Sequence, residues 1–299
     1  MARIGFIGAG AMGAPMIGHL IAAGHELTVN TRRREAAQPL VERGARWVAT
    51  PAEAAREAEF VCTNVTATED VEQVLFGQNG VVSGAAAGTV VIDFSTISAV
   101  ATREFARRLA ERGVEMLDCP VSGGTMGAQA ASLSIIVGGN AEVLERARPL
   151  LEKLGKTITH IGGNGAGQVV KACNQIVQVV NIQGIAEATL FARRNGVDPH
   201  KMLAALQAGL AGSRMLDMMG PKMAARDFAA GIEARLHQKD FGLAVAMTQA
   251  LGLSLPATAV VSQQLNALVG NGWGKDDTSS LLRVLEGANR GQGEGADEA

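Results

Sequence analysis

Cysteine, net charge and long apolar runs are all scarce in this chain, and each shortage excludes a class of protein. Three cysteines stand far apart among the 299 residues, at Cys62, Cys119 and Cys173, and no C-x-x-C pair occurs. An odd number of cysteines argues against a disulfide framework and favours a reducing compartment, the cytoplasm. The formal net charge is −2, so neither nucleic acid nor an anionic membrane surface is an expected partner. No uncharged apolar run reaches the roughly 18 residues of a membrane span.

Metal-ligand patterns are missing as well. The five histidines are scattered, and no cluster of His, Cys and Asp has the spacing of a metal site. We therefore expect neither a bound metal nor histidine-based acid–base chemistry. By contrast, 47% of the residues are hydrophobic and 19% are charged, which is typical of a globular protein. The length is sufficient for two domains with separate cores.

The first thirty residues predict a dinucleotide-binding turn. A short buried strand runs from Arg3 to Ile7, the segment Gly8-Ala-Gly-Ala-Met-Gly13 follows, and a helix with a proline in its first turn comes next. In such a unit the first glycine makes the turn, the second admits a pyrophosphate, and the third lets helix and strand pack closely. We expect the cofactor phosphates to be bound by Gly8, Gly10, Ala11, Met12 and Gly13. A glycine-rich structural turn is the alternative.

The end of the second strand bears on the choice of nicotinamide cofactor. An NAD site of this type places an Asp or Glu there to bond the ribose 2′-hydroxyl, whereas this chain has Asn30-Thr-Arg-Arg-Arg34. Guanidinium groups bind a 2′-phosphate well. We therefore expect Asn30, Arg32 and Arg33 to contact the adenosine ribose, with NADP(H) favoured over NAD(H). In the alternative, the arginines are solvated and Asn30 alone holds the ribose.

Strand and helix patterns alternate as far as Ile161 and include a helix predicted from Glu35 to Arg43. This alternation predicts an α/β fold with a doubly wound, mainly parallel sheet. Ligands of such sheets bind at the carboxyl ends of the strands. Three polar strand ends should therefore converge, namely Asn64-Val65-Thr66, Ser95-Thr96 and Ser122-Gly123-Gly124. A hydroxyl followed by two glycine amides can surround a carboxylate, although an ordinary glycine turn would have the same sequence.

A long helix is predicted from Gln168 to about Arg194, where Asn195-Gly196 provides a stop signal. Apolar residues such as Val177 occur on nearly every face, so we expect burial on most sides. The exceptions form one polar stripe, Lys171, Asn174, Gln178 and Asn181. Charges are rarely buried without a partner or a purpose. The helix should thus lie between two domains and present Lys171 and Asn174 to a ligand, unless the lysine merely extends to solvent.

Strand patterns stop after the long helix, and four further helical segments predict an all-α second domain. The expected organisation is a nucleotide-binding domain over residues 1–163 and a helical domain over residues 164–290. The long helix, at about 167–195, belongs to the second domain. Residues 291–299 are rich in glycine and acidic side chains and are expected to form a flexible tail.

Five motifs, taken in order, resemble those of the β-hydroxyacid dehydrogenase family over all but the last dozen residues. They are Gly8-Ala-Gly-Ala-Met-Gly-Ala-Pro-Met16, Ser95-Thr96, Asp118-Cys-Pro-Val-Ser-Gly-Gly124, Gly165-Ala-Gly-Gln-Val-Val-Lys-Ala-Cys-Asn174 and Lys239-Asp240. The resemblance implies an N-terminal Rossmann domain, a helical C-terminal domain, and a homodimer or homotetramer. It also implies an NAD(P)-dependent oxidoreductase that acts on a CH–OH group.

The resemblance also assigns roles to residues by position. Lys171 would be the catalytic lysine, and Ser122, Gly123 and Gly124 would hold the substrate carboxylate. Asn174 would bind a substrate oxygen and orient the lysine, while Thr96 and Lys239 would contact the nicotinamide half of the cofactor. Two positions depart from the family pattern. Gln175 stands where a second asparagine is common, and Val65-Thr66 replaces Leu-Pro, so a backbone contact is what we expect from Val65.

The activity implied is reduction of a small semialdehyde acid to a hydroxy acid. The segments Ala208–Asp217 and Asp276–Ser280 are most similar to those of members that reduce tartronate semialdehyde (2-hydroxy-3-oxopropionate) to glycerate. Lys171 would donate the proton in reduction and accept it in oxidation. The alternatives are 3-hydroxyisobutyrate dehydrogenase activity and a broad glyoxylate and succinic semialdehyde reductase. From another class, a non-catalytic nucleotide sensor or scaffold could share the fold.

Overall fold

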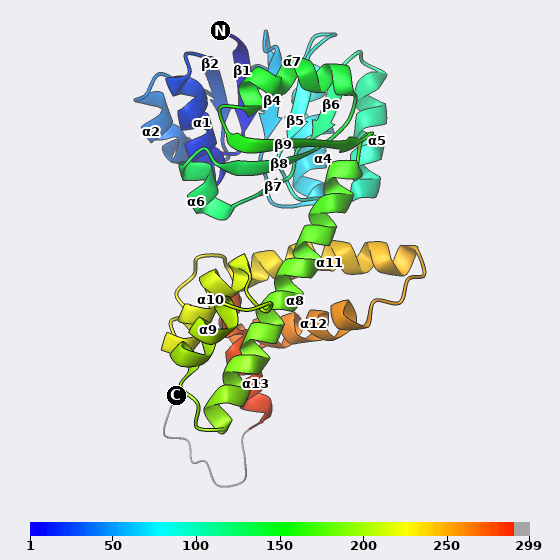
Figure 1. Cartoon of the computed structure of the whole chain (residues 1–299). Coiled ribbons are helices and arrows are strands. Elements are labelled where there is room, and N and C mark those ends of the chain that lie inside the picture. Colours follow the sequence, from blue (N-terminus) through cyan, green and yellow to red (C-terminus); the bar gives the residue numbers. More distant parts are fainter. Residues whose placement is uncertain (290–299) are drawn as a thin grey trace. The chain divides into compact units, whose positions relative to one another are not determined.

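The computed structural model describes residues 1–289, which form two compact units (Figure 1). The first unit comprises Met1–Lys171, and the second begins at Ala172. The change of unit falls within one long helix, α8 (Ala166–Arg194). The tail predicted at 291–299 lies outside the described residues.

The first unit is built on a nine-stranded sheet. The strands are β1 (Arg3–Ile7), β2 (Glu26–Asn30), β3 (Arg46–Val48), β4 (Phe60–Thr63), β5 (Val90–Asp93), β6 (Glu115–Asp118), β7 (Val121–Ser122), β8 (Leu133–Gly138) and β9 (Gly155–Gly162). Their order is β3-β2-β1-β4-β5-β6-β8-β7, with β9 paired to β8. All pairs from β3 to β6 are parallel, and β8 is antiparallel to both β6 and β7. The predicted doubly wound, mainly parallel sheet is therefore confirmed.

Helices cover both faces of this sheet. They are α1 (Gly13–Ala22), α2 (Gln38–Val41), α3 (Pro51–Ala55), α4 (Thr68–Phe76), α5 (Ala99–Ala110), α6 (Gly124–Gln129) and α7 (Ala141–Leu151), with the 3-10 turns η1 (Arg34–Ala37) and η2 (Val81–Ser83). The single helix predicted from Glu35 to Arg43 is wrong, because the segment divides into η1 and α2. Pro39 lacks the N–H that would donate to the carbonyl of Glu35 in a continuous helix.

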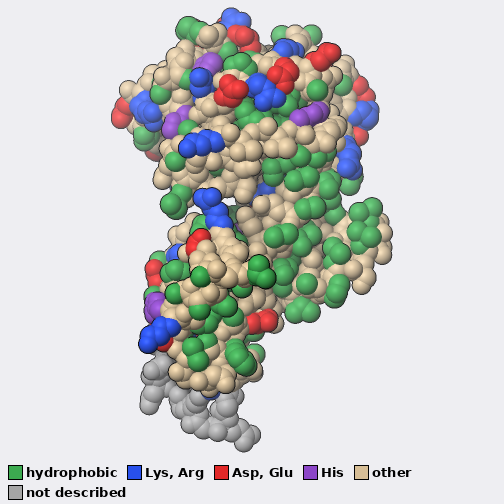
Figure 2. Space-filling model, viewed as in Figure 1, with side chains coloured by type: hydrophobic (Ala, Val, Ile, Leu, Met, Phe, Trp, Pro, Cys, Tyr) green, Lys and Arg blue, Asp and Glu red, His purple; other side chains and the backbone are tan. Residues whose placement is uncertain are grey.

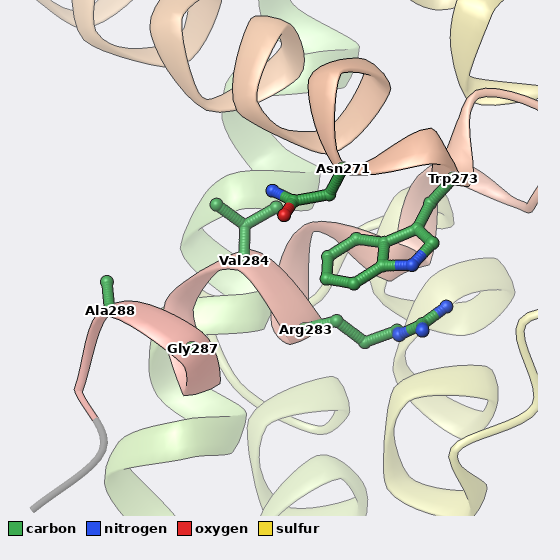
Figure 3. A pocket seen from close by; sticks show the side chains of 6 residues that line it. All are labelled: Asn271, Trp273, Arg283, Val284, Gly287 and Ala288. Carbon is green, nitrogen blue, oxygen red and sulfur yellow. The ribbon is translucent and has the colours of Figure 1, made fainter. Parts of the chain in front are cut away.

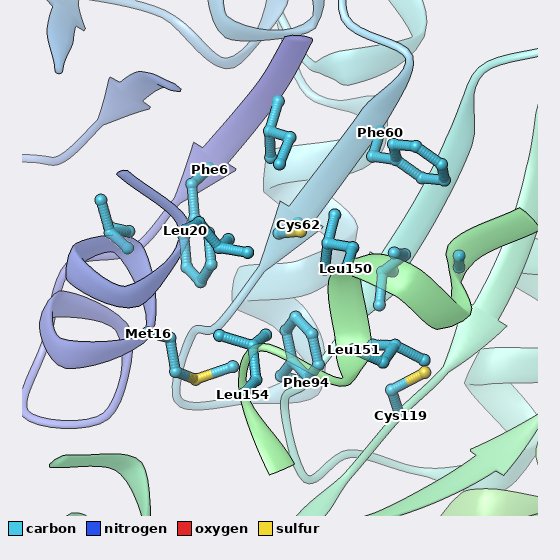
Figure 4. Close-up of a cluster of buried hydrophobic side chains, with 14 of the residues drawn as sticks. Phe6, Met16, Leu20, Phe60, Cys62, Phe94, Cys119, Leu150, Leu151 and Leu154 are labelled. Carbon is cyan, nitrogen blue, oxygen red and sulfur yellow. The ribbon is translucent and has the colours of Figure 1, made fainter. Parts of the chain in front are cut away.

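The two faces of the sheet have separate apolar cores because alternate residues of each strand point to opposite sides. Phe6 and Cys62 pack with α1 and α7 in the cluster shown in Figure 4. The neighbouring residues Ile7 and Val61 pack with α3, α4 and α5 on the other face. At Gly5, a Cβ would stand 2.2 Å from the carbonyl oxygen of Ala54, so glycine is what lets α3 approach the sheet so closely.

The second unit is entirely helical within the described residues. After α8 it contains α9 (Pro199–Gln207), α10 (Arg214–Ala225), α11 (Ala234–Ala250), α12 (Pro256–Leu268) and α13 (Leu281–Ala288), with the π-helical turn η3 (Val269–Trp273) and the 3-10 turn η4 (Thr278–Ser280). The all-α prediction for this part of the chain is confirmed. Within residues 1–289, no helix combines the length and hydropathy that crossing a bilayer requires.

As expected, α8 is buried or half-buried on most sides, and its exposed residues form one stripe that includes Val177 and Phe191. Its buried apolar residues, Val179, Ile182 and Ala186, recur at helical spacing and form one stripe in the core of the second unit. Val177 and Phe191 are 61% and 73% exposed. Figure 2 shows hydrophobic side chains at the surface of this unit. Apolar residues on nearly every face make a helix suited to burial, but the neighbouring helices decide which faces are covered.

Candidate functional site

The glycine turn after β1 has the geometry of a phosphate-binding loop. Gly8 has φ +98°, and a Cβ there would lie 2.2 Å from the carbonyl oxygen of Asn64. A Cβ on Gly13 would lie 2.0 Å from the carbonyl oxygen of Gly8, whereas nothing lies within 4 Å of a Cβ on Gly10. The N-terminus of α1 has no side-chain cap. An anion can thus approach the backbone at Gly10 and the first N–H groups of α1.

The register of the sheet places this turn at the topological switch point. The chain proceeds from β1 to β2 on one side and continues with β4 on the other, and Ile7 is paired with both Asn30 and Thr63. In parallel sheets a ligand binds at the carboxyl edge where this reversal occurs. Asn30 is 8% exposed, and its Nδ2 donates to the carbonyl oxygen of Val48 (3.0 Å).

The three arginines after β2 differ in their surroundings. The guanidinium of Arg34 lies 5.2 Å from the centre of the Trp47 ring, in cation–π contact. Arg32 and Arg33 are exposed, and their side chains have no ion pair or hydrogen bond within residues 1–289. Arg32 and Arg33 are therefore available to an external anion, and Arg34 is held by an aromatic neighbour.

A buried carboxylate organises the ends of β4 and β5. Asp93 Oδ1 accepts hydrogen bonds from Thr63 Oγ1 (2.8 Å) and from the amide of Ser95 (3.0 Å). Ser95 Oγ in turn accepts from the amide of Val65 (3.0 Å). The N–H of Val65 is therefore already engaged, which leaves its carbonyl for any backbone contact with a cofactor. Asp93 was missed in the sequence because it reads as the last residue of an apolar strand.

We expect Asp93→Asn to flatten the pH dependence of stability. Burial raises the pKa of Asp93 from 3.8 to about 6, against hydrogen bonds from Ser95 and Thr63 that lower it. The folded state therefore binds this proton more tightly, and the resulting stability, present below about pH 4, is lost as the pH rises through 6. A shift of this size corresponds to at most about 3 kcal/mol.

Urea unfolding between about pH 4 and pH 7 measures this difference. The free energy of unfolding of the wild type should fall relative to that of Asp93→Asn over this range. The asparagine Oδ1 can still accept from Thr63 and Ser95, so the loop geometry is preserved. Parallel profiles for the two proteins would show that the Asp93 carboxyl does not cause the pH dependence of the free energy of unfolding.

A second buried carboxylate joins β6 to the start of α8. Asp118 accepts from the amides of Gly165 (2.8 Å) and Gln168 (3.1 Å), and burial raises its pKa in spite of these bonds. Gln168 then donates from Nε2 to the carbonyl oxygen of Ser95 (2.8 Å) and accepts at Oε1 from the amide of Ile97 (3.2 Å). The two bonds of Gln168 fix the backbone on either side of Thr96, the residue predicted to contact the nicotinamide.

Lys171 lies at the turn that was predicted to hold a carboxylate. Its side chain is buried, with 7% of the residue exposed, and Nζ donates to the carbonyl oxygen of Val121 (3.0 Å), the residue before Ser122. Gly123 and Gly124 have φ +134° and +61°, so these two positions favour glycine, which has no side chain of its own beside its amide. The alternative of an ammonium extended into solvent is therefore wrong. The structure brings together Lys171 and Ser122-Gly123-Gly124.

The other predicted site residues, Asn174 and Lys239, are linked within the second unit. Asn174 Nδ2 donates to Gln175 Oε1 (2.9 Å), and Gln175 Nε2 donates to Asp240 Oδ2 (3.0 Å). Asp240 Oδ1 is paired with Lys239 Nζ at 2.7 Å. Neither Gln175 nor Asp240 was predicted to have a role. The sequence held no signal for either residue, because the family pattern has an asparagine at position 175 and the partner of Gln175, Asp240, is 65 residues away.

A pocket of about 460 Å³ in the second unit involves none of these residues (Figure 3). It is lined by Asn271, Trp273, Arg283, Val284, Gly287 and Ala288. Arg283 stacks over Trp273 (3.9 Å) and pairs with Asp276 (2.9 Å), so its charge is already compensated. Within residues 1–289 no group of three or more His, Cys, Asp or Glu side chains could hold a metal ion.

Two family models cover nearly the whole described chain. The model of the NAD binding domain of 6-phosphogluconate dehydrogenase matches residues 3–162. The model described as NAD-binding of NADP-dependent 3-hydroxyisobutyrate dehydrogenase matches residues 165–285. Their order agrees with the two units of the structure.

Individual relatives point in the same direction. The chain is 43% identical to 2-hydroxy-3-oxopropionate reductase of Escherichia coli over 284 residues, which is 95% of this chain and 97% of the relative. It is 36% identical to the NAD-dependent L-serine dehydrogenase of Pseudomonas aeruginosa, covering 96% and 98% of the two chains. The structure of Mycobacterium tuberculosis 3-hydroxyisobutyrate dehydrogenase with L-serine superposes with a TM-score of 0.89 at 32% identity, over 95% and 99%. The chain belongs to the β-hydroxyacid dehydrogenase family of nicotinamide-dependent oxidoreductases, which act on a CH–OH group.

Proposed function

We propose that this protein reduces tartronate semialdehyde to glycerate with NADPH as the hydride donor. The observation that carries the proposal is the buried ammonium of Lys171, held 3.0 Å from the carbonyl oxygen of Val121 at the entrance to the Ser122-Gly123-Gly124 turn. A substrate whose carboxylate sits on this turn would have its neighbouring carbonyl close to a proton donor. The 43% identity to the Escherichia coli reductase supports the choice of aldehyde.

Each group has a distinct task in the proposed reaction. The nicotinamide, when bound, supplies the hydride. Ser122 and the amides of Gly123 and Gly124 hold the carboxylate, which fixes the distance of the carbonyl from Lys171. Lys171 stabilises the negative charge that develops on the carbonyl oxygen and then protonates it; in the oxidation direction the same amine accepts the proton. Asn174 binds a further substrate oxygen, one helical turn after Lys171 on the same face of α8.

The cofactor assignment rests on Arg32 and Arg33, whose side chains have no partner among the described residues. Gly8, Gly10, Ala11, Met12 and Gly13 would bind the pyrophosphate. Asn30 would bind the ribose, and Arg32 and Arg33 would neutralise a 2′-phosphate, which only NADP(H) carries. The carbonyl of Val65 and the side chains of Thr96 and Lys239 would contact the nicotinamide half.

A substrate panel tests the proposed activity. We expect kcat/KM with NADPH to be highest for tartronate semialdehyde and lower for methylmalonate semialdehyde, which yields 3-hydroxyisobutyrate. Glyoxylate and succinic semialdehyde should also be poorer, because neither has both a carboxylate and an aldehyde joined by one hydroxylated carbon. Repeating the panel with NADH separates aldehyde preference from cofactor preference. A higher kcat/KM for methylmalonate semialdehyde would replace the proposed substrate by the 3-hydroxyisobutyrate alternative.

We also propose that the protein assembles as a homodimer or homotetramer. The exposed Val177 and Phe191 of α8 support this, since both lie outside the core of the second unit and would lose water-accessible apolar area in a subunit interface. The partner then required is a second copy of this chain, and neither a nucleic acid nor a membrane.

A further inference from the structure

We infer that Asp240 and Gln175 fix the direction of the Asn174 side-chain amide, so that its Oδ1 faces the substrate. This oxygen then selects substrates that carry a hydrogen-bond donor on the carbon between the carboxylate and the aldehyde. The inference rests on the proposed function and assigns to Gln175 and Asp240 the part of positioning residues. All the contacts that carry it lie within the second unit.

Three consecutive polar contacts join Asn174 to Gln175, Gln175 to Asp240, and Asp240 to Lys239. Gln175 is 2% exposed, and its amide bridges Asn174 Nδ2 (2.9 Å) and Asp240 Oδ2 (3.0 Å). The other oxygen of Asp240 is paired with Lys239 at 2.7 Å. A buried amide that lost either partner would leave a polar group unsatisfied, so the arrangement is maintained as a unit.

The carboxylate gives this network its direction. A carboxylate paired with an ammonium can only accept hydrogen bonds, so the group of Gln175 that faces Asp240 must be the NH₂. The Oε1 of Gln175 must then face Asn174 and can only accept, which requires the NH₂ of Asn174. Asn174 is therefore left with its Oδ1 pointing away from Gln175. The amide orientation follows from the charge of Asp240, whichever way the two amides are first assigned.

An Asn174 Oδ1 that faces the substrate would distinguish among small semialdehyde acids. With the aldehyde at Lys171, the substituent on the neighbouring carbon is the group that Asn174, one turn further along α8, would address. Tartronate semialdehyde has a hydroxyl there, which can donate to Oδ1. Methylmalonate semialdehyde has a methyl group, which cannot donate and would leave the oxygen unpaired. An ammonium at this carbon would also satisfy the acceptor.

The experiment compares Gln175→Leu with a matched control on the same helix. Gln183 is also buried, at 5% exposed, and its Nε2 also donates to a carboxylate, Glu187 Oε1 (2.8 Å), but it contacts no predicted site residue. The quantity measured is the ratio of kcat/KM for tartronate semialdehyde to that for methylmalonate semialdehyde. We expect this ratio to fall roughly ten-fold in Gln175→Leu and to stay at the wild-type value in Gln183→Leu. Effects on the cofactor or on overall stability act on both aldehydes and cancel in the ratio.

Asp240→Asn provides a second test that keeps the shape of the side chain. An asparagine at 240 can donate as well as accept, so both orientations of the Gln175 amide are then allowed, and the ratio should again fall. A wild-type ratio in both Gln175→Leu and Asp240→Asn would overturn the inference while leaving the reductase activity intact.

Failure of the proposed function gives a different result. If the wild type reduces neither aldehyde, the affinities for glycerate and 3-hydroxyisobutyrate are compared instead, by calorimetry with NADP⁺ present. A preference for glycerate that disappears in Gln175→Leu would support the inference without the activity. Equal binding of the two acids by the wild type, or binding of neither, would overturn it.

Discussion

Lys171→Met should lower kcat for the reduction of tartronate semialdehyde by roughly a thousand-fold or more. The methionine keeps the apolar stem that is buried beside Val121 but has no ammonium. Losing the proton donor costs about 10²–10⁴ in rate, and losing a preorganised charge at the developing oxyanion has an effect of similar size. Lys171→Ala should be at least as inactive. The measurement is kcat at saturating NADPH, followed by nicotinamide absorbance.

Cofactor binding provides the control for this prediction. The expected phosphate contacts come from the Gly8–Gly13 turn, so the Kd for NADPH, measured by nicotinamide fluorescence, should change little in Lys171→Met. Lys201→Met, an exposed position on α9, should have wild-type kcat. A kcat for Lys171→Met within ten-fold of the wild type would show that Lys171 is not the proton donor.

The double substitution Arg32→Ala, Arg33→Ala should reduce kcat/KM with NADPH by roughly ten- to a hundred-fold and leave kcat/KM with NADH nearly unchanged. Both side chains are exposed and unpaired within the described chain, so their removal leaves no buried group without a partner. The 2′-phosphate is the only charge by which the two cofactors differ, and charge-assisted bonds to it exist in one complex alone. Steady-state kinetics with each cofactor gives the ratio.

Arg34→Ala is the matched control for the double substitution. It removes one positive charge from the same loop, but its guanidinium is stacked on Trp47 at 5.2 Å. We expect a much smaller change in the NADPH to NADH ratio from Arg34→Ala. Equal losses with NADPH and NADH in the double variant would mean that Arg32 and Arg33 do not bind the 2′-phosphate, and Asn30 alone would then account for the ribose contact.

Several features of this protein could be predicted from the sequence because their causes are local. The spacing of Gly8, Gly10 and Gly13 dictates a close turn, since a Cβ at the first or third position would collide with a backbone oxygen about 2 Å away. The alternation of strands and helices requires parallel pairing, and α8 extends over an unbroken helical pattern. Apolar residues recur every two residues in a strand and every 3.6 in a helix, so these patterns are visible within a short segment without knowledge of what packs against it.

What the sequence could not supply depends on partners that are distant along the chain. The exposure of Val177 was missed because packing against other helices decides it. The break at Pro39 has a local cause and could have been predicted from the proline. Asp118 meets Gly165 across 47 residues and Gln175 meets Asp240 across 65, so no local pattern marks either pair.

The sequence by itself therefore determined the fold, the close glycine turn after β1 and Lys171 as the candidate catalytic residue, because steric and periodic constraints act within a few residues. Only the tertiary structure decided that Lys171 is buried against Val121 and that Gln175 couples Asn174 to a carboxylate. A hydrogen bond requires two groups within about 3 Å in a fixed orientation, and that proximity is created when separate segments pack together.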